Sequence, residues 1–220
     1  QAKFVVQRIR DLIEEGTDPS EIAVLYRAHF HSMELQMELT RGEIPFRITS
    51  GIRFFEQAHI KDVVAFMRFV VNPRDELSFR RMVMLLPGIG PGMAQKLWIR
   101  WTACPESRQE TPPESFSALM LDFPVPVKSR TAWTQLCYTL DELAPAGKLA
   151  GPASMLLSID EAVYDEYMQA AFENYDQRRQ DLLHLAGFSE RFESTEDFLS
   201  QLSLLGNTDD ESAAADFSGG

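Results

Sequence analysis

What this chain of 220 residues lacks already limits what it can be. It has no uninterrupted run of about 18 apolar residues, so no membrane-spanning helix is predicted. No basic-then-apolar leader stands at its start, and we therefore expect a cytoplasmic protein without membrane contact. Its two cysteines, Cys104 and Cys137, lie far apart with no cluster of histidines, which predicts two reduced thiols and no zinc site.

A phosphate-binding loop of the form G-x-x-x-x-G-K-[ST] is also missing. The only Gly-Lys step is Gly147-Lys148. Glu142 occupies the place of the first glycine, and Leu149 that of the Ser or Thr that would bind magnesium. The chain alone is therefore predicted not to hydrolyse a nucleotide, and no metal ligands are assigned.

Acidic residues are in excess overall, giving a net charge of −12, but the excess lies in one half of the chain. Residues 1–100 contain 14 Lys and Arg against 12 Asp and Glu, whereas residues 101–220 contain 7 against 21. We expect any nucleic-acid contact in the first half, and the acidic half to pack, to solubilise or to repel nucleic acid. On charge alone, a solvated helix face is the favoured interpretation of the basic excess.

The first 50 residues have the pattern of an α/β layer. Residues 22–25 are four consecutive apolar residues, which predicts a strand buried on both faces. A helix is expected next, and residues 44–48 predict a second strand. Ligands of α/β sheets lie beyond the carboxyl ends of the strands, so Tyr26 and Arg27 are candidates to meet a base and a phosphate. A solvated polar edge is the simpler alternative.

Beyond a predicted domain boundary near Ser50-Gly51, the pattern becomes helical. Residues 63–70 predict an apolar helix that ends at Asn72-Pro73, because proline does not continue a helix. Five prolines make residues 104–128 a surface excursion between helices. The other expected helices are residues 76–85, 129–144, 152–173, 176–186 and 195–205, the last with a capping box beginning at Ser194.

Residues 86–97 predict two helices joined by a glycine hairpin, and the segment resembles a helix-hairpin-helix motif. In that motif, glycines such as Gly88, Gly90 and Gly92 let backbone N–H groups approach a DNA phosphate, and the second helix directs its positive end at it. Such a contact reads the backbone, not the sequence. A tight turn that merely packs two helices is the alternative.

Four sequence blocks at close spacing carry a wider resemblance. They are Ala23-Val24-Leu25-Tyr26-Arg27, Ile44-Pro45-Phe46-Arg47-Ile48, Gly51-Ile52-Arg53-Phe54-Phe55-Glu56 and Ile60-Lys61-Asp62. In this order they resemble the UvrD/Rep/PcrA family of ATP-dependent DNA helicases, over about residues 1–205 and most densely over 21–98. The chain lacks that family's phosphate loop, metal-binding strand and later motifs, so it is expected to be a piece of a larger enzyme.

The resemblance implies roles for individual residues. Tyr26 matches a tyrosine that stacks on adenine, and Arg27 an arginine that reaches the γ-phosphate of ATP. The implied cofactors, ATP and Mg²⁺, belong to the parent enzyme, and none is expected in this piece. The remaining expected sites are DNA contacts, namely Gly88, Ile89, Gly90, Gly92, Lys96 and Arg179. Pro91 removes one amide donor from that set, and for Arg179 a helix-surface ion pair is equally expected.

We therefore expect a mainly α chain: a partial RecA-like α/β motor segment (2A-like) at residues 1–50, a helical 2B-like accessory domain at 51–206, and a polar linker or tail at 207–220. The resemblance implies a piece of a bacterial 3′–5′ DNA repair or replication helicase that contacts duplex DNA at the fork and is inactive alone. The alternatives are a regulatory or protein-binding module and part of a helicase–nuclease subunit. Repair proteins are possible partners, and the open strand edge predicts a non-native dimer.

Overall fold

The computed structural model describes residues 1–26, 29–48 and 54–207. This part of the chain is helical and contains no strand, so the protein is mainly α. None of its helices is long and apolar enough to cross a membrane. Four sequence-based predictions fall outside the described residues: Arg27, the boundary at Ser50-Gly51, residues 51–53 of the third block, and residues 208–220 of the expected tail.

The chain forms two compact units. Unit 1 begins with Gln1–Gln57 and takes in the chain again from Gln201, and unit 2 is Ala58–Ser200. The helical elements of unit 1 are α1 (Ala2–Glu14), η1 (Pro19–Glu21), α2 (His29–Arg41) and η2 (Phe54–Glu56). Val6 and Ile9 lie on one face of α1 and pack with Leu39 of α2 into a small apolar core.

The strands predicted at residues 22–25 and 44–48 are absent from the described residues, and this correction has a physical reason. Side chains of residues 43–48 alternate between outside and inside, as in a strand. A strand also needs a hydrogen-bonded neighbour, and no backbone hydrogen bond joins these two described segments. Leu25 is 95% exposed and Tyr26 36% exposed, so the predicted burial on both faces is wrong.

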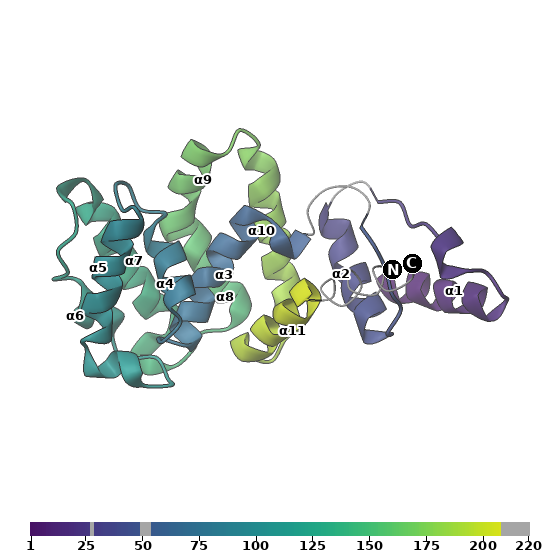
Figure 1. Ribbon diagram of the computed structural model, residues 1–220, viewed down its shortest axis with the longest axis horizontal. Coiled ribbons are helices and arrows are strands. Elements are labelled where there is room, and N and C mark those ends of the chain that lie inside the picture. Colours follow the sequence, from purple (N-terminus) through teal and green to yellow (C-terminus); the bar gives the residue numbers. More distant parts are fainter. Residues whose placement is uncertain (27–28, 49–53, 208–220) are drawn as a thin grey trace, which may run out of the picture. The chain divides into compact units, whose positions relative to one another are not determined.

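Unit 2 is a bundle of helices. Its elements are α3 (Ala58–Val71), α4 (Glu76–Val83), α5 (Pro91–Thr102), η3 (Pro105–Arg108), α6 (Phe116–Met120), η4 (Val127–Ser129), α7 (Arg130–Leu143), η5 (Pro145–Gly147), α8 (Pro152–Ile159), η6 (Asp160–Tyr164), α9 (Asp165–Ala171), α10 (Tyr175–Ser189) and the first half of α11 (Thr195–Asn207). Of these, η6 is a π-helical turn. Figure 1 shows α3, in blue, beside α8, in green, although the two are far apart in sequence.

The core of unit 2 surrounds α3. This helix is apolar on most of its circumference, which is typical of a helix packed on all sides. Phe69 meets the rings of Phe79, Trp101 and Phe116 at centroid distances of 5.2, 5.5 and 5.6 Å. Phe116 comes from the predicted surface excursion, so that segment also fills the core, because a large aromatic ring gains most when it is buried.

Local signals place several helix ends where the sequence predicts them. α3 ends one residue before Asn72-Pro73. Ser194 caps α11, since its Oγ accepts a hydrogen bond from the backbone N–H of Asp197 at 3.1 Å. Asp75 caps α4 in the same way, through the N–H of Ser78 at 3.0 Å.

Candidate functional site

The turn between α4 and α5 is exposed at its glycines and anchored by one apolar side chain. Gly88 has φ +80°, a left-handed conformation that favours glycine. Ile89 is 4% exposed, so it anchors the turn to the core. Gly88 and Gly90 lie at the surface. We call residues 86–92 the glycine turn.

The start of α5 presents unpaired backbone donors. Gly90 is the N-cap, and its carbonyl accepts hydrogen bonds from the N–H groups of Met93 and Ala94 at 3.0 and 2.9 Å. The structure records no acceptor among the described residues for the N–H groups of Gly90 and Gly92. Pro91 has no N–H. Two amides at the positive end of a helix therefore face solvent, an arrangement suited to an oxyanion.

Cationic and polar side chains surround this turn. Lys96 is exposed one helical turn after Gly92, on the same face of α5. From η4, the buried Ser129 donates its hydroxyl to the carbonyl of Pro87 at 2.5 Å, which ties η4 to the glycine turn. The structure thus brings together five of the six expected DNA-contact residues: Gly88, Ile89, Gly90, Gly92 and Lys96.

Arg179, the sixth, lies in a different environment. Its Nε is 3.7 Å from Oδ2 of Asp160 and 3.9 Å from Oδ1 of Asp165. Asp160 is 3% exposed, and this burial raises the pKa of its carboxyl group although the Arg179 charge acts in the opposite direction. Tyr175 donates its hydroxyl to Oδ1 of Asp165 at 2.5 Å. These contacts favour the ion-pair interpretation of Arg179 that the sequence left open.

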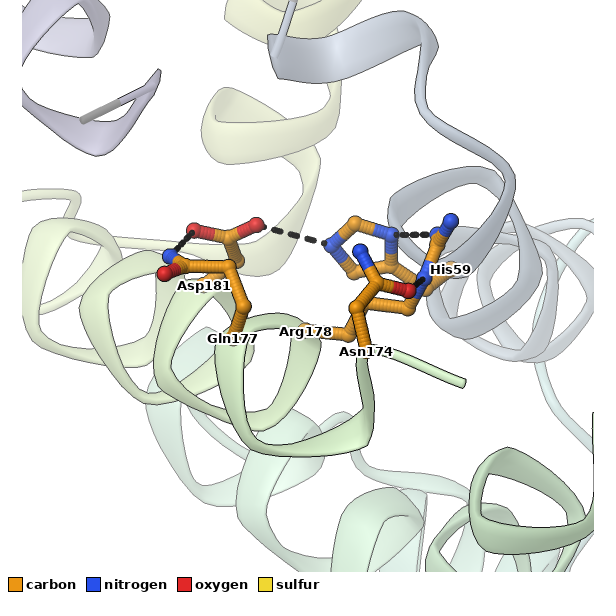
Figure 2. Close-up of polar contacts among 5 residues, drawn as sticks. All are labelled: His59, Asn174, Gln177, Arg178 and Asp181. Carbon is orange, nitrogen blue, oxygen red and sulfur yellow. Dashed lines mark hydrogen bonds and ion pairs between the residues drawn. The ribbon is translucent and has the colours of Figure 1, made fainter. Parts of the chain in front are cut away.

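The neighbouring Arg178 takes part in a buried polar group that Figure 2 shows. Its Nη1 lies 2.7 Å from Nδ1 of His59. Because a guanidinium only donates, Nδ1 is the acceptor, and Nε2 of His59 carries the hydrogen. That Nε2 lies 3.3 Å from Oδ2 of Asp181, and both residues are almost completely buried. Asn174 and Gln177 supply further hydrogen bonds to Arg178 and Asp181.

A second buried carboxylate, Asp62 on α3, is fully paired. Its Oδ1 accepts from Nε of Arg81 at 2.7 Å, and its Oδ2 accepts from the hydroxyl of Tyr164 at 2.7 Å. Burial, followed by the Asp62 charge, raises the pKa of Tyr164. The sequence analysis missed this pairing and the His59 group. The available signal was His59 and Asp62 near the start of a helix that is apolar over most of its length.

The expected nucleotide contacts are not brought together by the described residues. Tyr26 ends a described segment with its ring partly exposed, and Arg27 follows outside it. Among the described residues, no group of three or more His, Cys, Asp or Glu is placed to hold a metal ion. The glycine turn is therefore the candidate site that the geometry supports best.

The glycine turn lies within the part of the chain that matches known proteins. A family model described as the UvrD-like helicase C-terminal domain matches residues 1–123, more than half of the chain. The chain belongs to this family. The helicase resemblance drawn from the sequence blocks is thereby confirmed. In this UvrD-like chain, the matched part contains Tyr26, the glycine turn and Lys96, but not Arg179.

Named relatives of this UvrD-like chain are bacterial helicases. DNA helicase II of Haemophilus influenzae is 41% identical over 83 residues, which is 38% of this chain and 11% of that protein. DNA helicase II of Escherichia coli is 39% identical over 83 residues, 38% of this chain and 12% of that protein. ATP-dependent DNA helicase UvrD1 of Mycobacterium tuberculosis is 38% identical over 85 residues, which is 38% of this chain and 11% of that protein. The chain thus spans only 11–12% of these curated relatives' length.

Proposed function

We propose that this chain is a segment of a bacterial, cytoplasmic ATP-dependent helicase that moves 3′ to 5′ on DNA. Unit 2 is its 2B-like accessory domain, which holds duplex DNA at the fork and modulates unwinding. The family membership and the helicase names of the relatives support this proposal. Unit 1 is then part of the RecA-like 2A motor domain.

The observation that carries the proposal is the exposed glycine turn. The N–H groups of Gly90 and Gly92 face solvent at the positive end of α5, with Lys96 one turn further along. Two amide donors and a cation suit the oxygen atoms of a phosphate. α4, the turn and α5 then act as a helix-hairpin-helix element. It reads the DNA backbone and carries no base specificity.

ATP and Mg²⁺ are cofactors of the parent enzyme in this proposal, and Tyr26 and Arg27 are its adenine and γ-phosphate contacts. The residues present do not fit a complete nucleotide site. The sequence has no phosphate loop, and the exposed ring of Tyr26 supplies a stacking face without a cradle for phosphates. This chain alone accounts for no step of ATP hydrolysis, and we expect it to be inactive as an ATPase and as a helicase.

A second candidate function is a regulatory or protein-interaction module that does not touch DNA, in a repair helicase or in a helicase–nuclease subunit. The net charge of −12 favours it, because an acidic surface repels DNA. The exposed Leu25, next to the unpaired extended backbone, also makes a non-native dimer of the isolated chain an expected complication. Sedimentation at several concentrations would detect that dimer.

The test is fluorescence anisotropy of a labelled duplex with a 3′ single-stranded tail, titrated across a salt series. Each phosphate contact contributes about −0.9 to the slope of log affinity against log salt, so two to four contacts predict a slope of roughly −2 to −4. The decisive variant is Gly90→Asp. An Asp at the N-cap stabilises a helix start, and its negative charge repels phosphate. We expect DNA binding to be lost while the melting temperature is kept.

Gly151→Asp is the matched control. Gly151 is the N-cap of α8, is followed by Pro152 at the first helical position, and has open space around its Cα, as Gly90 has before Pro91. The control variant should bind DNA like the unchanged chain. Equal losses in both variants would show that added negative charge acts at a distance. No binding by the unchanged chain at low salt would favour the regulatory module.

A further inference from the structure

We propose that Lys128, on η4, is a further phosphate-binding residue of the surface formed by the glycine turn. The inference rests on the proposed function and extends it to a second segment of the chain. Lys128 lies beyond residues 1–123, so the family match does not assign it. Its partner is the sugar-phosphate backbone of duplex DNA.

The first argument is the position of Lys128. A methyl group placed on Gly88 would lie 1.9 Å from Cε of Lys128 and 2.8 Å from its Nζ. The end of the lysine side chain therefore rests directly on the glycine that makes the left-handed turn. The bond from Ser129 to the carbonyl of Pro87 holds the adjacent backbone in place. A cation that is already positioned loses less freedom when it binds.

The second argument is the charge of the two segments that meet here. Residues 77–105 and 123–140 contain no Asp or Glu, in a chain with 33 acidic residues. Their six cations are Arg80, Arg81, Lys96, Arg100, Lys128 and Arg130. Arg80 and Arg81 form ion pairs with Glu76 and Asp62. For Lys96, Lys128 and Arg130, the structure records no ion pair with any described carboxylate.

The third argument concerns the kind of partner. Lys96 and Lys128 are exposed and carry compact point charges, which suit a phosphate because no fixed orientation of the ligand is needed. The free amides of Gly90 and Gly92 also take an oxyanion. The shared chemistry is that of a polyanion with regularly spaced phosphates. Duplex DNA has phosphates at regular spacing. We choose it over other polyanions because the chain belongs to a helicase family.

The experiment is the same anisotropy titration with Lys128→Gln in the full chain. We expect the slope of log affinity against log salt to become shallower by about 0.9, the value for one phosphate contact. Lys128→Arg should restore the slope, because the positive charge is kept. Lys148→Gln is the matched control: it removes one exposed positive charge from the same unit, beside the η5 turn, and should leave the slope unchanged.

The outcomes separate this inference from the proposed function. Tight binding by the unchanged chain, with the same slope in Lys128→Gln, overturns the role of Lys128 and leaves the glycine turn in place. Equal changes in the Lys128 and Lys148 variants also overturn it, because net charge alone would then explain both. Absence of binding by the unchanged chain overturns both proposals. Melting temperatures of all variants exclude a loss of fold as the cause.

Discussion

Unit 2 contains two groups of cations that differ in their surroundings. Arg178 and Arg179 on α10 lie against a histidine, an aromatic ring and two carboxylates, at distances between 2.7 and 4.0 Å. Lys96 and Lys128 lie beside an exposed turn in two acid-free segments. In the first group, Arg179 pairs with two carboxylates and Arg178 is held by His59 and the Phe172 ring. In the second group, the structure records no ion pair with a described carboxylate, so the charges are available to a ligand.

The comparison teaches that a basic residue is a binding residue only where its own protein leaves it unpaired. The sequence predicted a DNA contact for Arg179, with a helix-surface ion pair as the alternative. The π-helical turn η6 and α9 supply two carboxylates that take up its charge. The sequence did not predict a role for Lys128, because Gly88, which its side chain contacts, is 40 residues away.

The largest expected effect comes from breaking the buried polar group at Asp181. Asp181→Ala leaves the buried Nε2–H of His59 without its polar neighbour, and a buried donor without a partner costs about 2 kcal/mol. We expect the free energy of unfolding, measured with urea, to fall by that amount. Asp176→Ala on the same helix, where the side chain is exposed, is the control and should cost less than about 1 kcal/mol. Equal losses would mean that the buried group adds no stability.

A smaller effect, on the order of 1 kcal/mol, is expected for Asp160→Asn. Burial raises the pKa of this carboxyl group, and its Oδ1 has no hydrogen-bond partner among the described residues. A raised pKa in the folded state favours folding at low pH, and that stability is lost as the pH rises through the raised pKa. The Asn variant should therefore melt higher than the unchanged protein at pH 7.

The advantage of the Asn variant should shrink as the pH is lowered, because the raised pKa lets the buried carboxyl group take up a proton more readily than an ordinary carboxylate. Glu166→Gln, at an exposed position of α9, is the control and should show no such pH dependence. Melting curves from pH 4 to pH 8 measure both variants. A melting temperature of the Asn variant that is lower at pH 7 would show that the ion pair with Arg179 outweighs the burial of Asp160.

The smallest expected effect sharpens the contrast between the two groups. Arg179→Gln should leave the salt slope of DNA binding unchanged, because its charge is already matched by Asp160 and Asp165. Lys96→Gln should make the slope shallower by about 0.9. Both variants lose one positive charge, so the anisotropy series compares them directly. A shallower slope in the Arg179 variant would move α10 into the DNA surface.

The sequence predicted those features that depend on neighbouring residues. The apolar α3 and its end before Asn72-Pro73, the cap at Ser194 and the glycine turn are all local patterns, and each is present. The strands at residues 22–25 and 44–48 were not found, because pairing depends on a distant partner strand. The ion-pair partners of Arg179 were not predictable either, since Asp160 and Asp165 come from other helical elements.

The helices α8 and α9 are continuous through the π-helical turn η6. This turn determines which side chains of the continuous helix face α3 and α10. In this turn the N–H of Asp165 bonds to the carbonyl of Asp160, five residues earlier, so the rod from α8 to α9 holds one residue more than a regular α-helix would. Each residue of an α-helix turns the chain by about 100°. The extra residue therefore rotates the sequence register of α9 against that of α8. Deleting one residue from η6 would leave every helix in place but would turn Tyr164 away from Asp62 and Asp165 away from Arg179. The residues next to them in the sequence would then take these positions.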